Sequence, residues 1–182
     1  MSFKELVVER ESIRRYADTT VERKKIEQCI EAARLAPSAC NAQPWHFIVV
    51  DDRTKLEKLA RYAASPVAKL NTFVKYAPVI VVAVAEPPNL SSKIGGLIKG
   101  KKYNIMDTSI AVEHFCLQAT ELGLATCIVG WFSAFKVKRL LGIPLTRKIP
   151  LMITVGYPAE KREPRKKVRK TLKEISSYNS YK

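Results

Sequence analysis

The sequence contains little of what catalytic and metal centres are usually built from. Its 182 residues include only two histidines, and its four cysteines stand singly, without a C-x-x-C pair. No spacing among these residues matches a usual zinc-ligand pattern. The G-x-S-x-G nucleophile elbow, the P-loop and the G-x-G-x-x-G turn are also missing. An enzyme with this sequence would therefore depend on a bound cofactor for its chemistry.

Long apolar segments are missing too. The longest apolar run, Val79–Ala85, has the length of a buried strand and falls far short of the roughly 20 residues that a membrane-spanning helix needs. Residues 1–5 lack the apolar core of a signal peptide. With 47% apolar and 27% charged residues, the composition is that of an ordinary globular protein. We expect a single domain, residues 1–182, in a cytoplasmic protein.

Acidic residues are too few to balance the basic ones. The chain has 17 Asp and Glu against 32 Lys and Arg, a formal net charge of +15. Residues 161–182 alone contain nine Lys or Arg and two Glu. This excess favours an anionic partner, which could be a nucleic acid, an acidic lipid surface or a phosphorylated cofactor. A nucleic-acid-binding module is the weaker alternative, because the chain has no recognisable binding motif and its aromatic residues do not alternate with the cations.

The stretch from residue 36 to residue 47 is the most informative part of the chain. A predicted helix ends before it, and a predicted strand begins within it. Two prolines stiffen the backbone, while Ser38, Asn41 and Gln43 carry a hydroxyl group and two carboxamides. Polar groups in a loop on a rigid scaffold are typical of binding sites. Carboxamides suit the edge of a flat, polar, heteroaromatic ligand better than they suit a metal ion.

Strands and helices alternate along the chain, which predicts an α/β or α+β fold with a small sheet covered by helices. The predicted strands are residues 45–50, 79–85, 125–129 and 151–155. The second strand is apolar throughout, so we expect it to be covered on both faces. The longest predicted helix spans residues 104–122, and Pro66 begins another, shorter helix. Residues 86–102, rich in Pro, Ser, Gly and Lys, predict a mobile lid or a loop that faces a partner.

Basic side chains near both ends of the chain suit a phosphate group. Arg10 and Arg14 flank a serine in the N-terminal segment, and Lys167 and Arg169 lie two residues apart in the tail. Residues two apart in an extended segment project to the same side. Guanidinium groups bind phosphate oxygens through two parallel hydrogen bonds. We therefore predict that these four cations converge on a phosphate, against the alternative that both runs are solvated surface.

Several motifs, in order along nearly the whole chain, resemble the FMN-dependent nitroreductase family. The first is R-E-S-I-R-R-Y at residues 10–16, and the most specific is P-S-A-C-N-A-Q-P-W at residues 37–45. L-G-L-A-T-C-I-V-G at residues 122–130 also fits, as does V-G-Y-P at residues 155–158 with the basic stretch after it. Glu11 departs from the basic or small residue that the family often has at this position.

The resemblance implies an α+β fold with a central, mostly antiparallel sheet flanked by helices, in a homodimer of intertwined subunits. One FMN would lie in each of two clefts at the interface, and the basic extension at residues 159–182 would reach the cofactor or the partner subunit. The family's activity implies an oxidoreductase that passes electrons from NADH or NADPH through flavin N5 to a nitro, quinone or similar small acceptor in a ping-pong cycle. No protein side chain is then needed as a catalytic group. A flavin-binding carrier or sensor without turnover would use the same residues.

The resemblance also implies which residues bind FMN, in three groups. One group holds the ribityl phosphate and the pyrimidine edge, another reaches in from the opposite subunit, and the third brings backbone close to the reactive N5 atom. The first comprises Arg10, Glu11 through its main chain, Ser12, Arg14, Lys167 and Arg169. The second comprises Pro37, Ser38 and Asn41, and Gln43 matches the motif beside them. The third comprises Val129 and Gly130, and Asn71 matches a further flavin-contacting asparagine.

Overall fold

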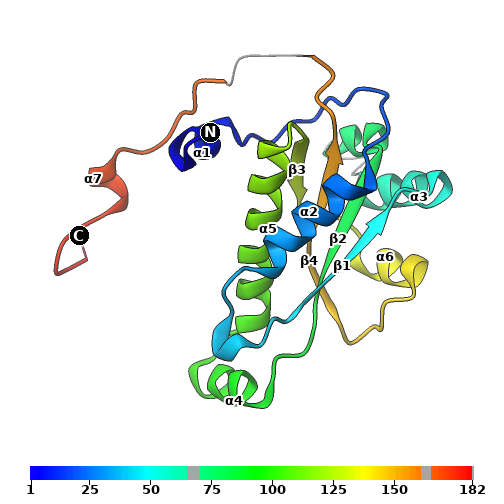
Figure 1. Ribbon diagram of the computed structural model, residues 1–182. Helices are drawn as coiled ribbons and strands as arrows, with labels where there is room; N and C mark the ends of the chain where they lie inside the picture. The colour runs from blue at the N-terminus through cyan, green and yellow to red at the C-terminus, as the bar shows by residue number, and fades with distance from the viewer. Residues whose placement is uncertain (65–69, 161–164, 182) are drawn as a thin grey trace.

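The sheet at the centre of the protein is antiparallel. The computed structural model describes residues 1–64, 70–160 and 165–181. Within these residues, four strands lie in the order β1-β2-β4-β3 (Figure 1). Their bounds are β1 Trp45–Val50, β2 Val79–Ala85, β3 Ala125–Val129 and β4 Lys148–Gly156. Each neighbouring pair is antiparallel, which confirms the sheet that the resemblance implies.

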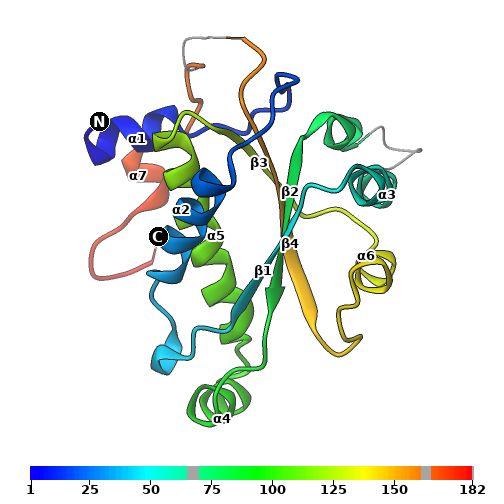
Figure 2. The same cartoon turned by 45° about the vertical axis from the view of Figure 1, so that its right-hand side comes forward.

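Helices cover both faces of this sheet (Figure 2). The helices of the described residues are α1 Phe3–Glu9, α2 Arg23–Arg34, α3 Arg53–Ala63, α4 Leu90–Lys99, α5 Tyr103–Glu121, α6 Ala134–Leu141 and α7 Leu172–Ile175, with 3-10 turns η1 Ala39–Asn41 and η2 Thr72–Tyr76. Helices α2 and α5 pack together over one face, whereas α3, α6 and η2 cover the other. Not one of the described helices is long and apolar enough to cross a membrane.

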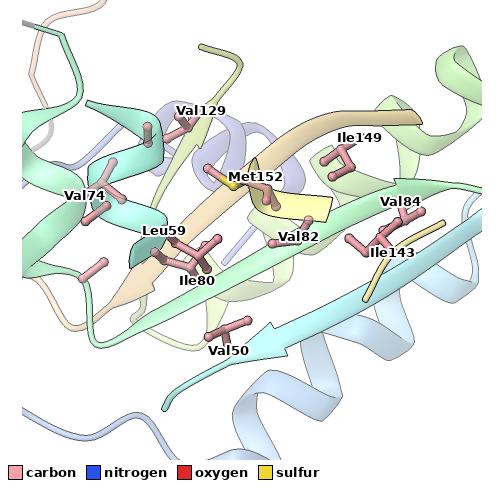
Figure 3. Close-up of a cluster of buried hydrophobic side chains, with 14 of the residues drawn as sticks. Val50, Leu59, Val74, Ile80, Val82, Val84, Val129, Ile143, Ile149 and Met152 are labelled. Carbon is pink, nitrogen blue, oxygen red and sulfur yellow. The ribbon is translucent and has the colours of Figure 1, made fainter. Parts of the chain in front are cut away.

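Strand β2 is buried along its whole length and contributes to a different core on each face. Alternate residues of a strand point to opposite faces of its sheet. Ile80 and Val82 therefore pack with Leu59 of α3 in the cluster of Figure 3. Val81, which lies between them, packs with Phe115 of α5 on the other face. The continuous apolar run of β2 is thus explained by cover on both sides, as its sequence predicts.

The regular elements lie close to where the sequence predicts them. Strands β1, β2 and β3 have the predicted bounds, and β4 is longer than predicted. Helix α5 is shifted by one residue at each end from its predicted range of 104–122. The helix predicted to begin at Pro66 starts outside the described residues, and residues 72–76 form the turn η2 rather than an α-helix.

Residues 86–102, predicted to be a mobile lid or a loop that faces a partner, are not a loop throughout, since they contain helix α4. The side chain of Asn89 caps its first turn by accepting a hydrogen bond from the backbone N–H of Ser92 at 2.9 Å. Gly100 ends it in the left-handed conformation, with a φ of 62°. Pro, Ser and Gly therefore mark the boundaries and the packed face of a helix here, rather than a loop.

Helix α4 turns its small residues inward and its large apolar residues outward. Ser92 and Gly96 are buried, and a Cβ on Gly96 would lie only 2.7 Å from the carbonyl oxygen of Lys101. Leu90, Leu97 and Ile98 are 73%, 75% and 73% exposed. This orientation is the reverse of that of an ordinary surface helix, in which the apolar stripe faces the core. The outer face of α4 is therefore an apolar surface.

Gly156, the last residue of β4, lies where the backbone passes two rings. A Cβ at this position would lie 2.8 Å from Cδ of Pro78 and 2.8 Å from Cδ1 of Tyr16. Because of this overpacking, we expect Gly156→Ala to lower the free energy of unfolding by about 1–3 kcal/mol, measured by urea denaturation. Gly95→Ala is the control, because a Cβ there meets no atom within 4 Å. An equal decrease in the free energy of unfolding of Gly156→Ala and Gly95→Ala would contradict the packing argument.

Candidate functional site

The two ends of the chain meet at a basic cavity. The N-terminal segment that follows α1 and the tail segment 165–169 enclose about 320 Å³. The residues that line it are Arg10, Glu11, Ser12, Arg165, Lys166, Lys167, Val168 and Arg169. Five of the thirteen residues that the resemblance implies for FMN binding are among them. We call this site the basic cavity.

The tail is attached to the N-terminal segment by hydrogen bonds of two side chains. Lys167 donates from Nζ to the carbonyl oxygens of Val7 and Arg10, both at 2.7 Å. The Glu11 carboxylate accepts from the backbone N–H of Arg165 at 3.1 Å and from its Nε at 3.4 Å. These contacts hold the tail close to the residue where α1 ends.

Positive charge is concentrated in the basic cavity. The pKa of Lys167 is lowered, chiefly because the ammonium group is desolvated and then because Arg10 and Arg169 repel its charge. Nε of Arg10 is held at 3.2 Å from Oε1 of Glu113 on α5. Crowded cations of this kind favour an anion that accepts several hydrogen bonds. The cavity therefore suits a phosphate group.

The N-terminal segment next joins strand β3. Ser12 forms a parallel bridge with Thr126, and Ile13 donates its N–H to the Thr126 carbonyl oxygen at 2.9 Å. Arg14 follows, with Cζ 5.5 Å from the centre of the Phe73 ring and Nη1 3.4 Å from the Ser12 carbonyl oxygen. The strand thus fixes the direction in which Ser12 and Arg14 are presented.

Asn71 lies beside the end of β3. It adopts a left-handed conformation with a φ of 57°, and its Nδ2 donates to the carbonyl oxygen of Trp131 at 2.9 Å. Val129 is buried, and Gly130 next to it is exposed. A Cβ on Gly130 would meet Leu151 only at an ordinary distance of 3.8 Å. Asn71 at the start of η2 therefore holds the backbone after β3, and Phe73 of the same turn carries Arg14.

The loop between α2 and β1 is organised by its own polar groups. The Ser38 hydroxyl accepts the N–H of Gln43 at 2.9 Å, and Nε2 of Gln43 donates to Oδ1 of Asn41 at 3.0 Å. Cys40, Asn41 and Gln43 all have positive φ values, from 45° to 52°. Asp107 of α5, whose pKa is raised by burial, accepts the N–H of the residue after Ser38 at 3.1 Å. We call residues 37–43 the amide loop.

The sequence-predicted site residues fall into two groups within the chain. A chain of contacts joins the basic cavity, Ser12, Arg14, Asn71 and the end of β3. The amide loop does not belong to this group. Figures 1 and 2 both place it beside α4, near one end of α5, whereas α1 lies towards the other end. One chain therefore brings most of the predicted residues together and leaves Pro37, Ser38, Asn41 and Gln43 apart from them.

Four residues of the basic cavity and its surroundings are missing from the sequence prediction: Arg165, Lys166 and Val168, which line the cavity, and Glu113 beside it. Arg165 is one of nine cations in the tail, and its alternate spacing with Lys167 and Arg169 is the signal that would have included it. Glu113, which pairs with Arg10, lies on α5 about 100 residues away in sequence, a separation over which no local pattern indicates pairing.

Comparisons with known proteins match most of this chain. The sequence profile described as Nitroreductase family matches residues 7–157. A crystal structure of a nitroreductase family protein from Clostridium novyi is 32% identical, covers 87% of this chain and 86% of its own, and superposes with a TM-score of 0.78. The FMN-dependent nitroreductase of Clostridium difficile R20291 is 28% identical over 97% of this chain and 98% of its own, with a TM-score of 0.77.

A curated relative is similar over the same region. It comes from Archaeoglobus fulgidus, and its assigned name is that of an NADH dehydrogenase/NAD(P)H nitroreductase. The identity is 32% over an alignment of 166 positions, which covers 87% of this chain and 86% of the relative. The profile match ends before the tail, so residues 165–169 of the basic cavity lie beyond it.

Proposed function

Because this chain belongs to the Nitroreductase family, we propose that it is an FMN-dependent oxidoreductase that takes electrons from NADH or NADPH and passes them to a small nitro or quinone acceptor. Two relatives support the cofactor and the reductant. The name of the Clostridium difficile protein includes FMN as its cofactor, and the name of the Archaeoglobus fulgidus protein includes NADH and NAD(P)H as reductants. Both match most of the length of this chain, so the proposal draws on the whole domain rather than on one motif.

The observation that carries the proposal is the basic cavity. Arg10, Lys167 and Arg169 line a space that Ser12 also lines. FMN carries a phosphate at the end of a ribityl chain, and this donor set matches a dianion that accepts several charged hydrogen bonds. Desolvation of Lys167 and the repulsion of its charge by Arg10 and Arg169 give a second reason, because a bound anion would offset both. The residues of the cavity thus fit the phosphate end of FMN.

Other residues of the same group suit the ring system. FMN, when bound, supplies hydride transfer at N5. Arg14, over Phe73, would hold the pyrimidine edge and stabilise the negative charge that this edge gains on reduction. Val129 and Gly130 would offer main-chain groups next to N5, where no titrating side chain is required. Reductant and acceptor would occupy the same pocket in turn, so we expect ping-pong kinetics.

We propose further that the protein is a homodimer, in which the amide loop of one subunit completes the FMN site of the other. Within one chain this loop lies apart from the basic cavity, so its carboxamides need a second copy to reach the cofactor. Apolar side chains suited to such a contact are exposed on α1 and on the tail, where Phe3 is 74% and Leu172 78% exposed. Figure 1 shows α7 and the rest of the tail running beyond the sheet, as a segment that contacts a second copy would.

The outer face of α4 suits the acceptor. Nδ2 of Asn89, the cap of α4, donates to the carbonyl oxygen of Cys40 in the amide loop at 3.0 Å. The apolar side chains of Leu97 and Ile98 would therefore lie over the same site that the loop completes. Such cover excludes water and favours a flat, apolar acceptor. We propose α4 as the lid that selects aromatic nitro compounds and quinones.

Anaerobic titration tests the proposal directly. We expect protein reconstituted with FMN to be yellow, to lose its visible flavin absorbance on addition of NADH or NADPH, and to regain it on addition of a nitroaromatic or a quinone. Initial rates over both substrates should give the parallel double-reciprocal lines of a ping-pong cycle. Flavin that binds but is not bleached by either nucleotide would indicate a carrier or sensor. Failure to bind FMN at all would overturn the proposed function.

A further inference from the structure

Glu11 places a carboxylate in a cavity that otherwise carries positive charge. Among the described residues that line the basic cavity, it is the one acidic side chain. Its side chain is only 7% exposed. A buried carboxylate is unfavourable unless it is paired, and a carboxylate beside a phosphate would repel it. Glu11 therefore needs a role that offsets both costs.

Arg165 is a partner of Glu11. Oε1 of Glu11 accepts from the backbone N–H of Arg165 at 3.1 Å and from its Nε at 3.4 Å. The same guanidinium group donates from Nη2 to the carbonyl oxygen of Ser12 at 3.5 Å. Backbone and side chain of one tail residue are thus held together by one carboxylate. The contact fixes the position of the tail main chain at residue 165, and not only that of a mobile side chain.

This contact opposes the repulsion within the cavity. Arg10 and Arg169 both disfavour the charged form of Lys167, whereas Glu11 favours it. Lys167 and Arg169 follow Arg165 in an extended segment, at the alternate positions that face one side. Holding Arg165 therefore holds the two cations that the proposed function assigns to the phosphate.

We propose that Glu11 is a positioning residue that holds the tail against the N-terminal segment through Arg165, so that Lys167 and Arg169 face the phosphate of FMN. The inference rests on the proposed function, because it takes FMN as the ligand of the basic cavity. It assigns to the Glu11 side chain a role that the resemblance, which implied a main-chain contact, does not contain. It predicts that loss of the carboxylate weakens FMN binding although it removes a negative charge from beside an anion.

The sign of the effect in Glu11→Gln is the first test. Simple electrostatics predicts tighter FMN binding when a carboxylate beside the phosphate is neutralised. A weaker tether predicts the opposite, because Gln keeps an acceptor oxygen but loses the charge that strengthens both hydrogen bonds. We expect the dissociation constant to rise by roughly tenfold, which corresponds to about 1.4 kcal/mol. Flavin fluorescence quenching measures it. Glu9→Gln, which removes an exposed carboxylate of α1 two residues away, is the matched control and should leave FMN affinity unchanged.

A double-mutant cycle tests whether the two residues act as one unit. Arg165→Gln removes the guanidinium contact and keeps the backbone N–H contact, so it should weaken FMN binding less than Glu11→Gln does. The double variant should bind FMN no more weakly than Glu11→Gln alone, because the Glu11 carboxylate accepts both contacts. Trypsin provides a readout without FMN. Cleavage within the tail of the unloaded protein should be faster in Glu11→Gln than in the wild type or in Glu9→Gln, at unchanged thermal stability of the domain.

Each outcome decides one of the two proposals. If wild-type protein does not bind FMN, the proposed function fails. If wild-type protein binds FMN and Glu11→Gln binds it equally well or more tightly, the proposed function stands and the tether is overturned. Effects of Glu11→Gln and Arg165→Gln that simply multiply in the double variant would also overturn it, as would tail cleavage at the wild-type rate.

Discussion

Replacing both Arg10 and Arg169 with alanine should lower the affinity for FMN by a factor of about a hundred or more. Each guanidinium group would make a charged hydrogen bond to the phosphate, and hydrogen bonds of this kind contribute about 1.5–3 kcal/mol each. The loss of two therefore corresponds to at least about two orders of magnitude in the dissociation constant. Flavin fluorescence quenching at constant ionic strength measures it. The fold should survive, because both residues lie outside the two buried clusters.

The control for this variant removes the same charge elsewhere. Arg23 and Arg53 lie on α2 and α3, their side chains are 92% and 91% exposed, and each pairs with a glutamate one helical turn away. Because exposed charges are screened by salt, Arg23→Ala combined with Arg53→Ala should leave FMN binding nearly unchanged. If both double variants lost FMN affinity to a similar extent, the net charge of the chain, and not the basic cavity, would determine FMN affinity.

The largest effect on stability is expected at Phe115 of α5. This side chain is fully buried between α5 and the sheet, with its ring centre 6.3 Å from that of Phe47 on β1. Replacement of a buried phenylalanine by alanine removes apolar contacts and leaves a cavity, which costs about 3–5 kcal/mol. That is a large share of the roughly 5–15 kcal/mol that stabilises a typical domain. Urea denaturation of Phe115→Ala measures the change in the free energy of unfolding.

Phe135→Ala is the matched control for this measurement. Phe135 belongs to α6 and is 59% exposed, so the same deletion removes few buried contacts and should change stability by less than about 1 kcal/mol. If Phe115→Ala were no more destabilising than Phe135→Ala, the core between α5 and the sheet would be less tightly packed than the burial of Phe115 indicates.

The sheet was predictable because its signal is local. Strand β2 is a run of valine, isoleucine and alanine bounded by Pro78 and Glu86. All of its residues are apolar, so the whole strand can be buried. In β3 the glycines at positions 123 and 130 bracket the strand in the sequence itself. The apolar composition of each strand and the residues that flank it were therefore sufficient to predict where these strands begin and end.

Helix α4 was missed because its pattern runs against the usual one. Helix prediction relies on an apolar stripe that faces the core, and here buried Ser92 and Gly96 form the inner face. Close packing of that face against the carbonyl oxygen of Lys101 selects glycine at position 96. Residues that ordinarily indicate a loop thus serve the packing of a helix, and only the tertiary contact distinguishes the two.

The sequence indicated which basic residues line the candidate site, but it did not indicate which acidic residues pair with them. The alternate spacing of Lys167 and Arg169 indicated a common side, and the structure brings both to the cavity that Arg10 lines. The contacts that hold these cations, from Glu11 to Arg165 and from Glu113 to Arg10, join positions about 154 and 103 residues apart. A single sequence carries no periodic signal over such separations. These two pairs of residues could therefore be identified only from the structure.

The basic cavity has a consequence for the order of events during synthesis. All four strands are complete once Gly156 has been made, whereas the cavity also needs residues 165–169. The sheet can thus form on a chain that is still unable to hold a phosphate. Under the proposed function, flavin capture becomes one of the last steps of biogenesis, and a product that ends before Arg165 would keep the sheet and remain colourless.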